Sequence, residues 1–270
     1  MWVLATALNA AAAAETVTIP GPGGLPLAGR YYSPAAAKGA PAIVMLHGCS
    51  GMWTAKGEPN PSYVFWAEHF QKLGYATLLL DSFRPRGQKE ICTQQDRAVS
   101  ESKDRPLDAH AALRWLVDRK EIDPKRIHLL GWSNGGSTTL NTLRSDAPGR
   151  EPSAGFRSAV AFYPGCARLA RTPYRPTAPL LILAGGADDW TPARHCEALA
   201  REAVAAGAPV QIEVYEGAHH AFDRIGGTVR FRPDVRNMNR PGGKGATIGS
   251  HPEARARAIE RATAFIEGQR

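Results

Sequence analysis

Three continuously apolar runs constrain the fold of this chain more than any other feature. Residues 43–46 read Ile-Val-Met-Leu, residues 77–80 read Thr-Leu-Leu-Leu, and residues 180–183 read Leu-Leu-Ile-Leu. Strands without polar alternation are typical of a parallel sheet whose two faces are both covered by helices. We therefore expect an α/β fold with a doubly wound, mostly parallel sheet of about eight strands. The strands are expected at residues 16–19, 29–33, 42–47, 76–81, 127–131, 158–163, 180–184 and 211–215, the first two as an antiparallel edge pair.

Helical segments separate these runs. Each follows a residue that can begin a helix by capping it or by fixing its first turn. No internal repeat or linker divides the chain, so a single domain is expected over residues 15–270. Residues 224–250, rich in Gly, Arg and Asn, are expected to form a surface excursion. The helices are expected to begin near Ser62, Pro106, Gly135, Pro192 and Pro252.

Charge and hydropathy exclude two classes of partner. The formal net charge is +8, but the Arg and Lys residues are scattered and form no basic block that would follow phosphates. We expect no nucleic-acid partner. No apolar run approaches the roughly 20 residues that span a bilayer, so no membrane span is expected. The sequence indicates a monomer or a small homo-oligomer without deciding between them.

The N-terminus resembles a secretory signal. The first fourteen residues are apolar apart from Thr6 and Asn9, and they end in an alanine run before Glu15. This fits the small-residue cleavage pattern, although no basic residue precedes the apolar stretch. We expect residues 1–14 to be a signal-peptide remnant and the protein to be secreted or periplasmic. An alanine-rich terminus on a cytoplasmic protein is the alternative.

Four cysteines agree with export, because an even count permits two disulfides. Cys49 and Cys92 both lie in loops that follow neighbouring strands, at one end of the sheet. Cys166 and Cys196 also follow consecutive strands. We therefore expect the pairs Cys49–Cys92 and Cys166–Cys196; four free thiols in a cytoplasmic protein are the alternative.

Residues 131–135 carry the strongest chemical signal, Gly-Trp-Ser-Asn-Gly. This G-x-S-x-G pattern directly follows an expected strand and leads into an expected helix. A sharp strand-to-helix turn exposes the serine hydroxyl, and small flanking residues let the chain bend. Ser133 is therefore the candidate nucleophile.

A serine nucleophile needs a base and an orienting carboxylate. His219 and His220 follow the last expected strand of the sheet, and spacing alone does not separate them. Asp188 follows the strand at 180–184, although Asp188 or Asp189 could equally be a turn residue or a helix cap. The chain order Ser133, Asp188, His220 is the order expected for an α/β-hydrolase.

An oxyanion hole requires two N–H donors. The backbone N–H of Asn134 follows the nucleophile, and Cys49, after the third expected strand, is the candidate for the second. Aromatic side chains in or near these loops could line an apolar substrate pocket or simply pack the loops. They are Trp53, Trp132, Tyr163, Trp190 and Phe222.

These segments together resemble the dienelactone hydrolase family of α/β-hydrolases. The resemblance implies that Asp188 is the acid and that His220, which precedes Ala-Phe, is the base. The family's namesakes carry cysteine at the nucleophile turn, whereas this chain has Ser133, so the resemblance favours a general ester hydrolase over a dienelactone hydrolase. The matching segments are residues 47–51, 81–83, 131–135, 185–192 and 220–223.

The sequence therefore predicts a serine hydrolase that cleaves small carboxylic esters through an acyl-enzyme. The alternatives are an acyltransferase, a C–C or amide hydrolase with the same triad, or a non-catalytic binding protein. No nucleotide-binding glycine fingerprint and no zinc-helix spacing is found, so neither cofactor nor metal is expected.

Overall fold

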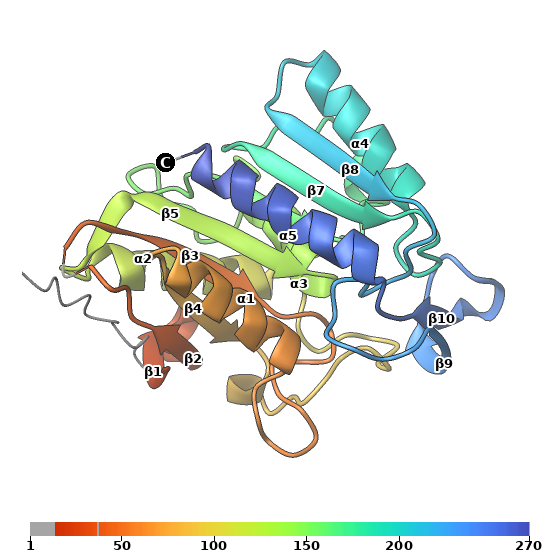
Figure 1. The fold of residues 1–270 in the computed structure, drawn as a ribbon, viewed down its shortest axis with the longest axis horizontal. Helices are drawn as coiled ribbons and strands as arrows, with labels where there is room; N and C mark the ends of the chain where they lie inside the picture. The colour runs from red at the N-terminus through yellow and green to blue at the C-terminus, as the bar shows by residue number, and fades with distance from the viewer. Residues whose placement is uncertain (1–13, 37, 270) are drawn as a thin grey trace, which may run out of the picture.

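Eight strands form one sheet in the part of the chain that the computed structural model describes, residues 14–36 and 38–269. They are β1 (Glu15–Pro20), β2 (Pro26–Tyr32), β3 (Ala40–Leu46), β4 (Ala76–Asp81), β5 (Ile122–Trp132), β6 (Ala159–Phe162), β7 (Leu180–Gly185) and β8 (Val210–Tyr215). The strand order is β1-β2-β4-β3-β5-β6-β7-β8 (Figure 1). β2 pairs antiparallel with β1 and β4, and the remaining strands pair in parallel. The predicted α/β sheet with an antiparallel edge is confirmed.

The candidate signal segment, residues 1–14, lies outside the described residues except for Ala14.

Five α-helices cover the sheet within the described residues. They are α1 (Pro61–Lys72), α2 (Asp104–Val117), α3 (Asn134–Thr142), α4 (Ala193–Ala205) and α5 (Pro252–Glu267). Side chains of β3 alternate between two cores: Val44 and Leu46 pack with α2, α3 and α4, and Ile43 and Met45 pack with α1 and α5. Figure 1 accordingly shows α1 and α5 in front of the sheet and α2 and α3 behind it. Helices on both faces explain why every residue of β3 is buried. None of the described helices has the length and apolarity to cross a bilayer.

Two helix starts differ from the sequence prediction by a few residues. Asn60, rather than Ser62, caps α1, because its Oδ1 accepts the N–H of Ser62 at 3.0 Å. Ser62 instead lies in the first turn, and its hydroxyl accepts the N–H of Ile225. α2 begins at Asp104, so that Pro106 still falls in the first turn, where its missing N–H costs no hydrogen bond.

The expected surface excursion contains a hairpin that the sequence analysis did not predict. β9 (Arg230–Arg236) and β10 (Lys244–Ile248) form a separate two-stranded sheet, at the lower right of Figure 1. Val235 and Ala246 are buried against the loops that carry Cys49 and Cys92. The hairpin thus lies over the carboxyl ends of the strands, where sites form in open α/β sheets.

Candidate active site

Ser133 occupies a strained turn between β5 and α3, with φ 54° and ψ −116°. Its N–H donates to the carbonyl of Phe162 at 2.9 Å, which holds the turn against β6. The flanking glycines are required by close backbone approach. A Cβ on Gly131 would lie 2.3 Å from the carbonyl oxygen of Gly135, and one on Gly135 would lie 2.1 Å from that of Leu46. The chain can bend this sharply because positions 131 and 135, where there is no room for a side chain, are both glycine.

Ser133, His220 and Asp188 form one hydrogen-bonded chain. Ser133 Oγ lies 2.8 Å from His220 Nε2, and His220 Nδ1 lies 2.8 Å from Asp188 Oδ2. His220 and Asp188 are 2% and 5% exposed, so water does not compete for these bonds. With the Nδ1 proton donated to Asp188, the other ring nitrogen is free to accept the serine proton. The structure therefore brings together the three residues that the sequence analysis selected.

Backbone and side-chain donors surround the Asp188 carboxylate. Oδ1 accepts the N–H groups of Trp190 and Thr191, both at 2.8 Å, and Oδ2 accepts the Thr191 hydroxyl at 2.8 Å. Burial alone would raise the pKa of Asp188, but the charge and hydrogen bond of His220 and the Thr191 donors outweigh it and hold the pKa below its ordinary value. Asp188 is therefore a carboxylate at neutral pH. Sequence reasoning missed Thr191, although it follows the acid by three residues.

The neighbouring Asp and His have different partners. Asp189 accepts the N–H of Thr247 at 2.7 Å and pairs with Arg240 at 3.1 Å, so it fastens the β9–β10 hairpin to the site. His219 Nδ1 lies 2.9 Å from the carbonyl oxygen of Ala187. Neither reaches Ser133, which separates the alternatives that spacing left open.

The loop after β3 lies against Ser133, the candidate nucleophile. A Cβ on Gly48 would lie 3.4 Å from Ser133 Cβ, and the Gly48 N–H already donates to the hydroxyl of Tyr63 at 2.9 Å. Among the described residues, the N–H groups of Cys49 and Asn134 have no hydrogen-bond acceptor. Asn134 is the first residue of α3, so its N–H has no partner within the helix. Both N–H groups thus remain available beside Ser133.

Both expected disulfides are present. Cys49–Cys92 joins the loop after β3 to the segment after β4, and Cys166–Cys196 joins the segment after β6 to α4. Ile91 also donates its N–H to the carbonyl of Cys49 at 2.8 Å. The Cys49–Cys92 disulfide and this hydrogen bond together hold the backbone of Cys49 in place.

Comparison with known proteins decides the family. The model of the dienelactone hydrolase family matches residues 27–269. The chain belongs to the dienelactone hydrolase family. Family membership makes it an α/β-hydrolase of the carboxylic ester hydrolase class. An uncharacterized protein of Mycobacterium tuberculosis is 26% identical over 215 residues, which are 73% of this chain and 69% of that protein. A probable 2-oxo-3-(5-oxofuran-2-ylidene)propanoate lactonase of Bradyrhizobium is 26% identical over 165 residues, 56% of this chain and 63% of the lactonase.

Solved structures share the fold. Esterase 2 of Thermogutta terrifontis, phosphoramylated by tabun, superposes with a TM-score of 0.68 at 21% identity and covers 96% of each chain. A structure from Klebsiella pneumoniae, named for the dienelactone hydrolases, gives a TM-score of 0.70 at 19% identity and covers 96% of this chain and 99% of its own.

In this dienelactone hydrolase family member, Ser133 and His220 open onto a cavity of about 400 Å³. Of the five aromatic residues expected there, Trp132, Tyr163 and Trp190 line it, and Tyr63 joins them. Two do not line it. Phe222 is fully buried among other aromatic rings, including that of Tyr215. Trp53 turns its indole N–H to Asp81 and its ring beneath the guanidinium of Arg84.

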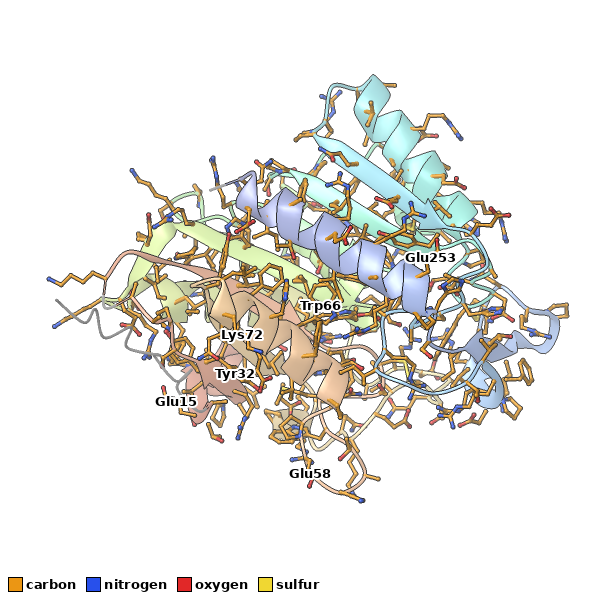
Figure 2. The ribbon with its side chains drawn as sticks, viewed as in Figure 1. Glu15, Tyr32, Glu58, Trp66, Lys72 and Glu253 are labelled. Atoms are coloured by element: carbon orange, nitrogen blue, oxygen red, sulfur yellow. A yellow bond between two sulfur atoms is a disulfide. The ribbon has the colours of Figure 1, made fainter. Side chains whose placement is uncertain are left out.

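Asp223 is a buried residue of the cavity lining and binds three aromatic side chains in and beside that lining. Its carboxylate accepts hydrogen bonds from the indoles of Trp66 and Trp132, at 2.9 and 2.8 Å, and from the Tyr163 hydroxyl at 2.6 Å. Trp66, labelled in Figure 2, is a fully buried residue of α1. Burial raises the pKa of Asp223, although the three donors favour its charged form. Sequence reasoning gave this residue no role, although it ends the segment 220–223 that carries the family resemblance.

Strained backbone conformations cluster around the same site. Within the described residues, the non-glycine residues with positive φ are Ser133, Tyr163 (36°) and Ala221 (62°). Such conformations persist only where the surroundings enforce them, and they cluster at functional sites. No group of three or more His, Cys, Asp or Glu side chains in the described part of the chain is arranged to hold a metal ion.

Proposed function

We propose that this chain is a serine carboxylesterase that hydrolyses small esters through an acyl-enzyme. The observation that carries the proposal is the continuous hydrogen-bonded chain from Ser133 through His220 to Asp188, which opens onto a cavity. Ser133 is the nucleophile, His220 the general base and Asp188 the residue that orients the imidazole and stabilises its charged form.

In the first step Ser133 Oγ bonds to the ester carbonyl carbon and its proton passes to His220 Nε2. The carbonyl oxygen becomes an oxyanion, stabilised by the N–H groups of Cys49 and Asn134. The C=O bond then re-forms, the bond to the alcohol oxygen breaks, and the departing oxygen takes the proton from His220. Water, deprotonated by His220, attacks the acyl carbon, and Ser133 Oγ leaves with that proton as the acid is released.

The comparisons support this chemistry at the level of class. A structure of similar fold is an esterase that tabun phosphoramylates, and a curated relative is named a lactonase. Both names concern electrophilic acyl or phosphoryl centres. An acyltransferase or an amide hydrolase would use the same three residues and differ in the acceptor or the leaving group.

The test is hydrolysis of p-nitrophenyl esters, from acetate to decanoate, by wild type and by Ser133→Ala. Saturable turnover should fall by about 10⁴-fold or more in the variant, since the nucleophile and base act as one unit. Ser153→Ala, at an exposed serine, serves as the control. A fluorophosphonate should add its mass to the Ser133 peptide only. Turnover that survives in Ser133→Ala would place the nucleophile elsewhere.

We further propose that the protein is exported and that residues 15–270 form its mature domain. Two disulfides are consistent with an oxidising compartment. Mass spectrometry of the full chain expressed in a bacterial host should find Glu15 at the N-terminus and no free thiol in the periplasmic fraction. An intact N-terminus in a cytosolic, reduced protein would contradict export.

A further inference from the structure

A second cavity, of about 260 Å³, opens beside Ser133. Ser133 and Trp190 line both cavities, so they form the wall between them. Three arginines line each cavity, but the larger cavity also has an aromatic wall, whereas the smaller one is mostly polar. The side chains that distinguish the smaller cavity are those of Arg97, Glu101, Ser137, Arg168 and Arg236.

Positive charge exceeds negative charge in the smaller cavity. Arg97, Arg168 and Arg236 line it with a single carboxylate, Glu101, whose contact with Arg97 is long at 3.9 Å. Arg236 makes no ion pair within the described residues. The Nε atoms of Arg97 and Arg236 are buried and have no acceptor among the described residues. Buried donors of this kind are normally satisfied, so an acceptor that enters the cavity would complete their hydrogen bonding.

Backbone hydrogen bonds and a nearby disulfide hold Arg97 and Arg236 in place. The N–H of Arg236 donates to the carbonyl of Cys92 at 2.8 Å, and the indole of Trp190 donates to the carbonyl of Arg236 at 2.8 Å. Arg97 follows Cys92 by five residues, in the segment fixed by the Cys49–Cys92 disulfide. Burial lowers the pKa of Arg97; Glu101 opposes this shift, and the positive charge of Arg236 adds to it. The two guanidiniums therefore repel each other, and a shared anion would relieve that repulsion.

The positions of the proposed catalytic groups indicate which part of the ester each cavity would hold. His220 and Cys49 line the larger cavity and not the smaller one. Because the departing alcohol oxygen takes its proton from His220 Nε2, the alcohol part of the ester belongs in the larger cavity. The acyl part, bonded to Ser133, then extends into the smaller one.

We propose that the smaller cavity is an acyl-side anion subsite, in which Arg97 and Arg236 bind the free carboxylate of a dicarboxylic acid monoester. This inference rests on the proposed esterase function and names its substrate class. The acyl chain would run from Ser133 to the two guanidiniums, which match a carboxylate in charge and in hydrogen-bond geometry. The aromatic wall of the larger cavity would contact an apolar alcohol.

Arginines at the larger cavity are the competing location for an anion. Arg224, Arg230 and Arg232 line it. Arg232 is already bound by both oxygens of Asp234, at 2.9 and 2.7 Å. Arg230 is exposed, so water screens its charge. An anion bound there would belong to the alcohol part of the ester, which makes the two locations separable by substrate.

The test compares three esters: monoethyl adipate with an anionic acyl group, ethyl hexanoate as its neutral counterpart, and 4-acetoxybutanoate with the anion on the alcohol. Wild type should favour monoethyl adipate over ethyl hexanoate in kcat/KM. Arg97→Gln and Arg236→Gln should each lower that ratio about 10-fold, mainly through KM, because a charge-assisted hydrogen bond is lost. Arg97→Lys should retain more of the ratio, and Arg257→Gln on α5, an exposed arginine paired with Glu213, controls for net charge.

The outcomes separate the two proposals. Hydrolysis of ethyl hexanoate without preference for the monoester overturns the subsite and leaves the esterase proposal intact. Preference for 4-acetoxybutanoate that is lost in Arg230→Gln moves the anion to the larger cavity and also overturns it. If wild type hydrolyses none of the esters, the proposed function fails, and calorimetric binding of adipate then tests the subsite alone. Binding that persists in the Arg97→Gln/Arg236→Gln double variant overturns the subsite.

Discussion

The hydroxyl of Tyr163 donates a 2.6 Å hydrogen bond to the buried carboxylate of Asp223, and the Tyr163 ring lies 4.7 Å from the imidazole of His220. Asp223, which lies outside the proposed triad, therefore supports the ring against which the proposed catalytic base packs. Tyr163 also has φ 36°, so its backbone favours other conformations and its side-chain contacts help to hold it.

Replacing Asp223 should destabilise the fold more than most single substitutions. Asp223→Ala leaves the Trp66, Trp132 and Tyr163 donors buried without an acceptor. Each such donor costs on the order of 1–3 kcal/mol, so the free energy of unfolding should fall by about 3 kcal/mol or more. Urea unfolding measures this. Asp223→Asn keeps one acceptor oxygen and should lose less; equal losses in the two variants would contradict the hydrogen-bond explanation.

Thr191→Val should lower kcat about 10-fold with little change in KM, because one donor to a charged carboxylate is worth about 1.5 kcal/mol or more. The Thr191 hydroxyl lies 2.8 Å from Asp188 Oδ2 and 3.0 Å from His220 Nδ1, so it holds the proposed acid and base in position. Steady-state kinetics on a p-nitrophenyl ester gives both constants. Thr191→Ser keeps the hydroxyl and should restore most of kcat; a serine variant as slow as the valine variant would assign the loss to packing.

The two disulfides should have different effects on activity. Chain separations of 43 and 30 residues imply that removing either bond costs about 4 kcal/mol in the loop-entropy view. Cys49→Ala/Cys92→Ala should also lower kcat, since the N–H of Cys49 is a proposed oxyanion donor. Cys166→Ala/Cys196→Ala should lose stability but keep kcat wherever it stays folded. Thermal unfolding and kinetics on both pairs distinguish these effects, and equal loss of kcat would argue against a role for the Cys49 loop.

The sheet could be predicted because the central strands are buried on both faces and so read as continuous apolar runs, as in β3, where every residue is buried. The nucleophile turn could be predicted because its steric demands fall within five consecutive residues. The β9–β10 hairpin could not. Most of β9 is exposed and it contains Pro233, so it shows no apolar alternation.

Some relations between distant segments were also beyond the sequence. Asp223 accepts hydrogen bonds from α1, from β5 and from the residue after β6, and the fold brings Arg97 and Arg236 to one cavity. Trp53 shows the same limit, since its nearness in sequence to the oxyanion loop did not place it in the cavity. Spacing predicts which residues follow strands at the same edge of the sheet; it does not predict where their side chains turn.

Acid should weaken the fold through His47, which follows β3 and is 2% exposed. Its Nδ1 lies 2.8 Å from the carbonyl oxygen of Gly48, and its Nε2 accepts the N–H of Ser82 at 3.3 Å, so both ring nitrogens are occupied in the neutral form. Burial, and then the positive charge of Arg105, lower the pKa of His47 from 6.5 to about 3, against the opposing charge of Asp81.

Because the folded pKa lies below the unfolded value, the unfolded state binds the proton more readily. The contribution of His47 to stability is therefore complete above about pH 6.5 and is lost as the pH falls from there toward 3. Between pH 7 and pH 5 the loss should be about 2 kcal/mol. Urea unfolding of wild type and of His47→Gln at both pH values checks this. The variant has no titrating group at this position, so its free energy of unfolding should fall by about 2 kcal/mol less over the same interval. An equal fall in the two proteins would show that His47 is protonated in the folded state or that other groups control the acid response.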